Sequence, residues 1–485
     1  MNTWKFSAVL CGALLAIGCP ENDDDAKDPT GDTGNTEDTA PEDALGTIVD
    51  VLTLEGDFTT VLGGAQLAAG LADALSDPMA GPFTVFAPTD DAFNQAFVDL
   101  GIKNPTDLIG NTALLTALLE YHVVEGVVRS TDITGPGLTT DTLNDLALFY
   151  APSGGTVGVN GGAEAGTTGG ADVTTPDLEA SNGVVHTIDR VLLPPDVISA
   201  AIYATRSGNA QLGELAAALG SEGLIEPFQV DLLADDITAL DQFTVLAPVD
   251  DGFPDQPPKG LGQILSYHVL SGAVTSSNLP AFAPTLATQA FGGTDLPLTM
   301  FFDTSEGVAF NGGDGGPAIG ASAVATDITT LNGVVHVIDN VLLPLDVVQM
   351  AQVGGLDTLV TAVLAADPIG KTSVVDFLAQ TSPVTVFAPS NDAFDTAFPG
   401  GLPADGGAIT GVLGLHVVAD GALLDAANLP AQADTITEAT LSFDTAATPP
   451  TVTVGGGNTA NIDAVDLGAT NGVVHLIDSV LLISE

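Results

Sequence analysis

The sequence predicts three tandem domains, each of which combines α-helices with short β-strands. One phrase, Asn-Gly-Val-Val-His, occurs three times and starts at Asn182, Asn332 and Asn471. The spacing of about 150 residues is that of an ordinary domain, and it is too long for a solenoid of small stacked repeats. Helix-like and strand-like segments also follow one another in the same order in each unit. We therefore expect three independent domains.

Each unit opens with apolar residues at helical spacing, as in residues 47–76 of the first unit. A phrase with a β-branched start follows, and it begins at Thr84, Thr244 and Thr385. We interpret its first half as a strand that stops at a proline, because proline cannot continue inside a sheet. The Thr/Ser-Asp after the proline supplies side-chain oxygens for the N-cap of a new helix.

The next helix ends in an aromatic–His or Leu–His pair, and a Gly- and Thr-rich stretch of short strands then leads to the closing phrase. The middle unit is irregular, because fewer residues separate Phe253 from His268 than separate Phe93 from His122. A Pro-rich run occupies part of that gap. We therefore expect a shortened helix in the middle unit. The three pairs are Tyr121-His122, Tyr267-His268 and Leu415-His416.

The first 19 residues have the pattern of a targeting segment. Lys5 precedes an apolar run from Phe6 to Ile17, which is too short to span a bilayer and has the length of a signal-peptide core. The run leads to Ala-Ile-Gly before Cys19, which resembles the lipobox of bacterial lipoproteins, with Ala16 where leucine is usual. We therefore expect lipid attachment at Cys19. An ordinary secretory signal with an incidental cysteine is the alternative.

Residues 20–43 are rich in Asp, Glu, Thr, Gly and Pro and contain no large apolar residue. Such a segment cannot bury enough surface to fold, and its like charges keep it extended. We interpret it as an acidic disordered tether, with a calcium-binding run as the alternative. Its acids do not match the spacing of an EF-hand loop. The predicted domains that follow it span residues 44–194, 195–344 and 345–485.

The charge and the cysteines exclude several classes of function. The chain contains eight Lys and Arg residues and 62 Asp and Glu residues, which give a formal net charge of −54. This surface repels phosphate backbones and anionic headgroups, so we expect no nucleic-acid partner and no membrane contact except through a lipid anchor. Solubility in a salty medium explains the charge better than loading with divalent cations, because no tight carboxylate motif dominates. The other cysteine, Cys11, lies in the signal core, so the mature chain has no thiol for a disulfide or a zinc site.

Three separated motifs together resemble the fasciclin (FAS1) domain. These are T-V-F-A-P-[ST]-[DN]-x-A-F, the Tyr-His pair and N-G-V-V-H-x-I-D-x-V-L-L-P, and they occur in this order three times over residues 44–485. The resemblance implies a compact α+β domain in which a wedge or sandwich of short β-strands is flanked by helices. It also implies an extracellular or surface-anchored protein that acts in adhesion and is not an enzyme.

All six histidines belong to the repeats, two in each unit. A zinc or catalytic site built from each pair is the alternative to a structural role, but the chain has no HExxH or CxxC motif. In a strand over residues 184–193, His186 and Asp189 point to opposite faces and cannot form a local dyad. We therefore predict a turn and a core strand. The residues of this structural motif are Asn182, His186, Asp189, Asn332, His336, Asp339, Asn471, His475 and Asp478.

In some animal members of the resembling family, the Tyr-His region and nearby apolar residues are linked to integrin binding. The resemblance therefore implies a partner-binding patch in this chain. Packing at a helix end, where a histidine near the last carbonyls is favourable, is the structural alternative. Leu415 replaces the tyrosine in the third unit, so a tyrosine-dependent role is in doubt there. The implied patch residues are Tyr121, His122, Tyr267, His268 and His416.

These expectations describe a lipid-anchored protein of the bacterial cell envelope, at the outer membrane or cell surface rather than secreted. It acts without a cofactor or metal by non-covalent binding to extracellular matrix, a cell-surface protein or a polysaccharide. A metal-dependent or hydrolytic enzyme with a site from distant residues is one alternative, and a passive surface spacer is another. The Gly-rich run at residues 311–316 predicts a loop, with weak calcium binding at Asp314 as the alternative.

Overall fold

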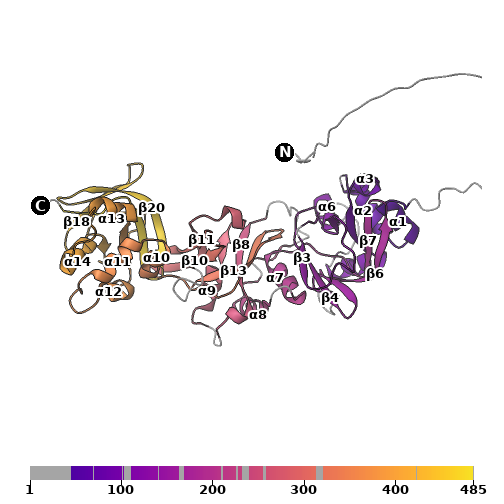
Figure 1. The fold of residues 1–485 in the computed structure, drawn as a ribbon, viewed down its shortest axis with the longest axis horizontal. Coiled ribbons are helices and arrows are strands. Elements are labelled where there is room, and N and C mark those ends of the chain that lie inside the picture. The colour runs from indigo at the N-terminus through magenta and orange to yellow at the C-terminus, as the bar shows by residue number, and fades with distance from the viewer. Residues whose placement is uncertain are drawn as a thin grey trace, which may run out of the picture. The chain divides into compact units, whose positions relative to one another are not determined.

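The computed structural model of the chain contains three successive copies of one α+β fold, which confirms the predicted fold class (Figure 1). The lipobox cysteine, the tether and Asp314 lie outside the described residues, so the predictions for them are not addressed by the fold. The structure describes residues 45–483 except 69, 101, 103–110, 140, 163–168, 209–210, 226–227, 232–239, 255–257, 313–319 and 422.

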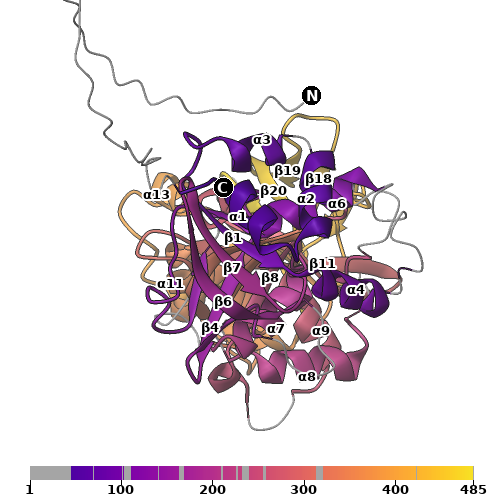
Figure 2. The same ribbon diagram turned by 90° about the vertical axis from the view of Figure 1, so that its right-hand side faces the viewer.

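The first repeat combines a group of helices with one seven-stranded sheet in the order β2-β1-β7-β6-β5-β4-β3. The central pair, β1 and β7, is parallel, and the other neighbours are antiparallel. Figure 2 shows β1, β7 and β6 side by side in this repeat. Its elements are α1 (Ile48–Glu55), α2 (Thr59–Leu67), α3 (Leu71–Ser76), β1 (Phe83–Pro88), α4 (Asp90–Asp99), α6 (Thr112–Tyr121), β2 (Val123–Glu125), β3 (Gly137–Thr139), β4 (Leu148–Ser153), β5 (Thr156–Val159), β6 (Ala171–Ala180) and β7 (Gly183–Ile188).

The second repeat keeps this plan, with β8 and β14 as its parallel central pair and a long β10–β11 hairpin. Its elements are α7 (Val197–Arg206), α8 (Gly213–Glu222), β8 (Phe243–Pro248), η2 (Asp250–Gly252), α9 (Leu261–Tyr267), β9 (Val269–Ser271), η3 (Ser276–Asn278), β10 (Phe282–Phe291), β11 (Thr294–Asp303), β12 (Ala309–Phe310), β13 (Ala321–Thr330) and β14 (Gly333–Ile338).

The third repeat has β15 and β21 as its parallel central pair. Its elements are α10 (Val347–Val353), α11 (Asp357–Ala365), α12 (Val374–Gln380), β15 (Val384–Pro389), α13 (Asn391–Ala397), α14 (Gly406–Gly414), β16 (Val417–Val418), β17 (Gln432–Asp434), β18 (Thr440–Asp444), β19 (Thr451–Val454), β20 (Thr459–Ala469) and β21 (Gly472–Ile477).

The helix after the first central strand depends on its N-cap residue. Thr89 and Ser390 each accept a backbone N–H of the first turn, and α4 and α13 follow them. Val249 occupies this position in the second repeat and has no side-chain oxygen, and Pro254 follows where a longer helix would need a backbone N–H, so only the short 3₁₀ turn η2 forms there. The expectation of a shortened helix in the middle unit is confirmed.

The central strands of each repeat are buried on both faces and separate two apolar cores. In β1, Val85 and Ala87 face the core beneath the helices, and Phe86 faces a second core among the strands. This alternation follows from the two-residue period of a strand. The closing strand β7 is buried along its whole length. The apolar Val-Val-His segment is therefore central scaffold in each repeat.

Consecutive repeats also share apolar contacts. Phe149 of β4 lies 6.3 Å from Tyr203 of α7 between ring centroids, and both belong to one buried cluster. Phe301 of β11 joins the helical core of the third repeat in the same way, together with Met350 of α10. The first helix of the second and third repeats thus packs on a strand of the repeat before it.

Candidate functional site

The asparagine of each closing phrase joins the last strand to the first helix of its repeat. The Asn182 side chain accepts the N–H of Ile48 through Oδ1, at 2.9 Å, and donates through Nδ2 to the carbonyls of Leu75 and Asp77. Asn332 and Asn471 repeat this arrangement with the first residues of α7 and α10. All three side chains are buried. Each asparagine thus satisfies an N–H at the start of one helix and at least one carbonyl elsewhere in its repeat, which at the first and third repeats lies at the end of another helix.

The glycine after this asparagine allows the two central strands to approach closely. A Cβ on Gly183 would lie 1.9 Å from the carbonyl oxygen of Phe83 on β1. Gly333 and Gly472 show the same spacing to the facing strands of their repeats. No side chain fits at that distance, so glycine is required by the neighbouring backbone.

Both ring nitrogens of the histidine in each closing strand are hydrogen-bonded to backbone groups. His186 Nδ1 accepts the N–H of Asp177 at 3.2 Å, and Nε2 donates to the carbonyl of Val128 at 2.8 Å. His336 and His475 make the same two bonds in their repeats. Burial lowers the pKa of all three rings. These are neutral Nε2–H histidines.

The carboxylate closest to His186 comes from the neighbouring strand and not from the closing phrase. Asp177 Oδ1 lies 3.9 Å from His186 Nδ1. Asp177 sits at a bulge of β6 with φ of 60° and accepts the N–H and the hydroxyl of Ser130. The second repeat has the equivalent Asp327 and Ser276. In the third repeat, Asp466 accepts only a backbone N–H, from Ala426.

Serine, aspartate and histidine therefore meet in two repeats, but their connections are not those of a catalytic triad. In a triad, the histidine takes the proton of the serine and the aspartate orients the histidine. Here the serine hydroxyl donates to the aspartate, and the ring is bonded to backbone on both sides. The arrangement pins a strand bulge to the preceding loop and leaves no ring nitrogen to act as a base.

Asp189 of the closing phrase has a separate structural task. Its Oδ1 accepts the N–H of Asp172 at 2.8 Å, where β6 begins. Asp339 and Asp478 accept the corresponding N–H groups of Ser322 and Asn461. The strand ends at Ile188 and not at residue 193 as predicted. His186 and Asp189 have different partners, in agreement with the expectation that they form no local dyad.

The histidine at each helix end forms a second repeated bridge. His122 Nδ1 donates to the carbonyl of Leu118 at 2.7 Å, and Nε2 accepts the N–H of Leu192 at 2.9 Å. His268 and His416 make the same bonds. Burial lowers the pKa of each of these three rings to about 4. These histidines are neutral and carry the Nδ1–H proton.

The implied partner-binding patch requires a correction, because its side chains do not reach the surface. Tyr121 and Tyr267 are 0% exposed, and His122, His268 and His416 are each 2% exposed. The Tyr121 hydroxyl donates to the carbonyl of Ala147, next to β4, and the Tyr267 hydroxyl donates to the carbonyl of Thr299 in β11. A partner cannot touch these side chains in this conformation. Their effect on a partner is limited to shaping the surface above them.

Two buried asparagines belong to this arrangement and were not anticipated from the sequence. Asn160 and Asn311 are 0% exposed, have φ near 50°, and bond to the hydroxyls of Tyr121 and Tyr267. In the third repeat, Gly455 makes the backbone bond that Asn160 makes in the first. The tyrosine and the asparagine are thus replaced together. The signal was present in the sequence, where the first two repeats contain Asn-Gly-Gly and the third Gly-Gly-Gly.

The described residues show no further grouping that suggests metal chemistry. Within them, no three or more His, Cys, Asp or Glu side chains are arranged to hold a metal ion. Over the same part of the chain, no helix has both the length and the apolar character of a membrane span.

Comparison with known proteins identifies the family to which the three repeats belong. A family model described as "Fasciclin domain" matches residues 56–194, 210–344 and 356–483. Protein sll1483 of Synechocystis is 38% identical over 156 residues, which cover 32% of this chain and 78% of that protein. The transforming growth factor-beta-induced protein ig-h3 of Sus scrofa is 26% identical over 369 residues, which cover 73% of this chain.

The chain spans 47% of the length of that ig-h3 relative. Among solved structures, the FAS1 domain pair of the insect cell adhesion molecule fasciclin I is similar with a TM-score of 0.37 and 17% identity. That match covers 60% of this chain and 98% of the domain pair.

Proposed function

The chain belongs to the fasciclin domain family, and from this premise we propose that it is an envelope-anchored adhesion protein that binds matrix or cell-surface partners non-covalently. The observation that carries the proposal is the presence of three fasciclin segments in one chain. Fasciclin domains support a role in adhesion or matrix interaction in general. Tandem domains add avidity when a surface presents its binding group many times.

The state of the histidines supports binding rather than catalysis. A general base or a metal ligand needs a ring nitrogen with a free lone pair. In all six rings, the acceptor nitrogen already receives a backbone N–H. Recruitment of a ring to chemistry would leave a buried N–H without a partner, which costs about 1–3 kcal/mol.

The net charge limits which classes of partner can bind. A chain with a formal charge of −54 repels acidic polysaccharides and nucleic acids at low ionic strength. Neutral polysaccharides and proteins with basic surfaces fit this charge. The anchor we propose is a lipid on Cys19, and residues 20–43 serve as the tether between the anchor and the domains.

Attachment of cells to a matrix-coated surface tests this proposal. We expect a deletion strain to attach less than the wild type, and a plasmid copy to restore attachment. A Cys19→Ala copy should be released from the envelope and should not restore attachment. A Cys11→Ala copy is the matched control, because that cysteine lies in the signal core, and it should restore attachment fully. Unchanged attachment in the deletion strain would favour the passive spacer.

Metal analysis of the purified mature protein tests the enzyme alternative. We expect no stoichiometric zinc, and no change in metal content in His122→Ala or His186→Ala. One metal ion per repeat that is lost in either variant would contradict the binding proposal and support a metal-dependent enzyme.

A further inference from the structure

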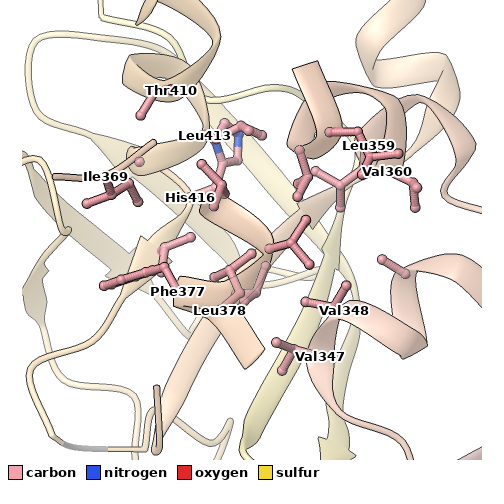
Figure 3. Close-up of a pocket in the computed structure, with 18 of the residues that line it drawn as sticks. Val347, Val348, Leu359, Val360, Ile369, Phe377, Leu378, Thr410, Leu413 and His416 are labelled. Carbon is pink, nitrogen blue, oxygen red and sulfur yellow. The ribbon is translucent and has the colours of Figure 1, made fainter. Parts of the chain in front are cut away.

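The third repeat contains an apolar cavity of about 80 Å³ between α10, α11, α12 and α14. Figure 3 shows the side chains of Leu359, Val360, Phe377 and Leu413 around it. Leu364 also lines the cavity and is 70% exposed, so the cavity reaches the surface of the domain. Protein interiors are close-packed, so a cavity of this kind in an aliphatic core needs an explanation.

One cause of the cavity is a small residue on α10. The closing-strand asparagine bonds the first N–H of α1 and of α10 in the same way, which aligns the two helices residue by residue. In this alignment, Ala351 of the third repeat takes the place of Leu52 of the first. Leu52 is 1% exposed and belongs to the core of its repeat. Ala351 lacks three of its carbon atoms and lines the cavity.

A second position on α11 adds to the space. Thr60 N–H bonds to Asp90 Oδ1 in the first repeat, and Thr358 N–H bonds to Asn391 Oδ1 in the third. This contact aligns the following helices, so that Val360 takes the place of the larger Leu62. Both positions are therefore smaller in the third repeat than in the first, and the same alignment places Ala201 and Ala216 there in the second repeat.

Three polar side chains line the cavity: Gln352 is exposed, and Thr410 and His416 are already hydrogen-bonded. The Thr410 hydroxyl donates to the carbonyls of Gly406 and Asp367. Both ring nitrogens of His416 are bonded to backbone groups. A polar ligand group inside the cavity would find no partner there and would lose its own hydration. The part of a ligand that enters must be hydrocarbon.

The volume of the cavity and the net charge of the protein further limit which ligands can bind. The cavity has about half the volume of an engineered apolar cavity of roughly 150 Å³ that holds benzene. Such a space is too small for a ring system, but it can take the end of a single alkyl chain that enters from the surface. The headgroup would remain outside, on a chain with a net charge of −54 that repels carboxylates and phosphates.

We propose that the third repeat binds one alkyl chain of an uncharged amphiphile in this cavity. The first repeat cannot offer the same space, because the larger Leu52 and Leu62 occupy the aligned positions in its core. The proposal is independent of adhesion, since it concerns the interior of one domain.

Titration of the full mature protein with 1-octanol tests the site, with binding followed by calorimetry. Ala351→Leu introduces the residue of the first repeat, and we expect it to weaken octanol binding roughly tenfold or more by occupying the space of two or three methylene groups. Ala365→Leu is the matched control, because it adds the same atoms at an exposed position of α11, and it should bind as the wild type does. Octanoate should bind more weakly than octanol.

Absence of octanol binding to the wild type would overturn the proposal, and so would equal binding by Ala351→Leu. Val360→Leu is the second variant if Ala351→Leu does not fold, and it should also weaken binding. Flotation with phosphatidylcholine vesicles shows whether the bound alkyl chain comes from a bilayer lipid or from a free amphiphile. Vesicle binding that Ala351→Leu abolishes identifies a bilayer lipid, whereas octanol binding without flotation identifies a free amphiphile.

Discussion

A buried histidine that accepts a backbone N–H through one ring nitrogen and donates to a carbonyl through the other is held neutral. Protonation would place a hydrogen where the accepted N–H already points, and burial also opposes the charge. This explains why the pKa of His122 falls to about 4. The two histidines of each repeat are locked in opposite tautomers, Nδ1–H at the helix end and Nε2–H in the closing strand.

The pH dependence of stability follows from this locking. The unfolded chain binds a proton at each histidine below about pH 6.5, whereas folded His122 does so only near pH 4. The folded pKa is the lower one, so this contribution to stability is complete above pH 6.5 and is lost as the pH falls toward 4. We expect His122→Gln to reduce the slope of unfolding free energy against pH by about 1.4 kcal/mol per pH unit in this range. Urea unfolding at several pH values measures it, and an unchanged slope would contradict the assignment.

The Tyr121–Asn160 pair makes a second prediction at this scale. Replacement of Tyr121 by Leu leaves the buried Asn160 amide short of a partner, so it should cost more than the lost contact area alone. Adding Asn160→Gly reproduces the third repeat and removes a residue with φ of 51°. We expect the double variant to be less destabilised than the sum of the single variants, by about 0.5–3 kcal/mol. Additive effects in thermal unfolding would show that the two residues are not coupled.

Strand alternation was sufficient to exclude a His186–Asp189 dyad from the sequence. It could not identify Asp177 as the nearest carboxylate, because that contact depends on a bulge in the adjacent strand. The patch of Tyr-His side chains was implied by resemblance and is corrected by burial. Sequence spacing alone cannot show on which side of a helix end a core will form.

At the scale of elements, side-chain bonds to backbone groups determine where helices start and how they meet the sheet. Helices follow the N-caps at Thr89 and Ser390, whereas Val249, which cannot cap, and Pro254, which cannot continue a helix, leave only a 3₁₀ turn. These outcomes were predictable because capping is local in sequence. The link from Asn182 to α1 was not, since it joins residues 134 positions apart.

Asn182 tests this link between elements. Asn182→Ala leaves one N–H and two carbonyls of the helical region without their partner, and we expect a loss of about 1–3 kcal/mol in the unfolding free energy. Asn182→Asp keeps the acceptor for the Ile48 N–H but replaces the donating amide with a negative oxygen beside two carbonyls. It should therefore also be destabilised. Asn144→Ala is a control, because that side chain makes a single bond to one carbonyl. If Asn182→Ala is as stable as this control, the hydrogen bonds of Asn182 do not stabilise the fold.

At the scale of the whole molecule, apolar contacts between consecutive repeats stabilise the folded chain, whereas its net charge destabilises it. Phe149 and Phe301 bury apolar surface against the next repeat, and Thr440 takes the aligned position in the third repeat. The repeat motifs predicted three domains. They did not predict the apolar contacts between consecutive repeats, because Phe149 and Phe301 lie in strands between the motifs. The net charge of −54 opposes compactness throughout.

Salt should therefore stabilise the protein. Eight basic residues can neutralise only a small part of 62 acidic ones, so most of the repulsion must be screened by ions. The Debye length falls from about 10 Å at 0.1 M to about 3 Å at 1 M salt. We expect the melting temperature to rise with NaCl over this range, and MgCl₂ at equal ionic strength to act similarly if no divalent site exists. A melting temperature that does not depend on NaCl would contradict this account of the charge.

The central claim is that the repeated histidines hold the fold together and take no part in catalysis or metal binding. Long-range ¹H–¹⁵N spectra of the histidine-labelled mature protein test it most directly, because they report the tautomer and the pKa of each ring. The account predicts Nδ1–H rings at His122, His268 and His416, Nε2–H rings at the other three, all with lowered pKa and no response to zinc. A ring that titrates at or above pH 6.5, or that shifts with stoichiometric zinc, would contradict it.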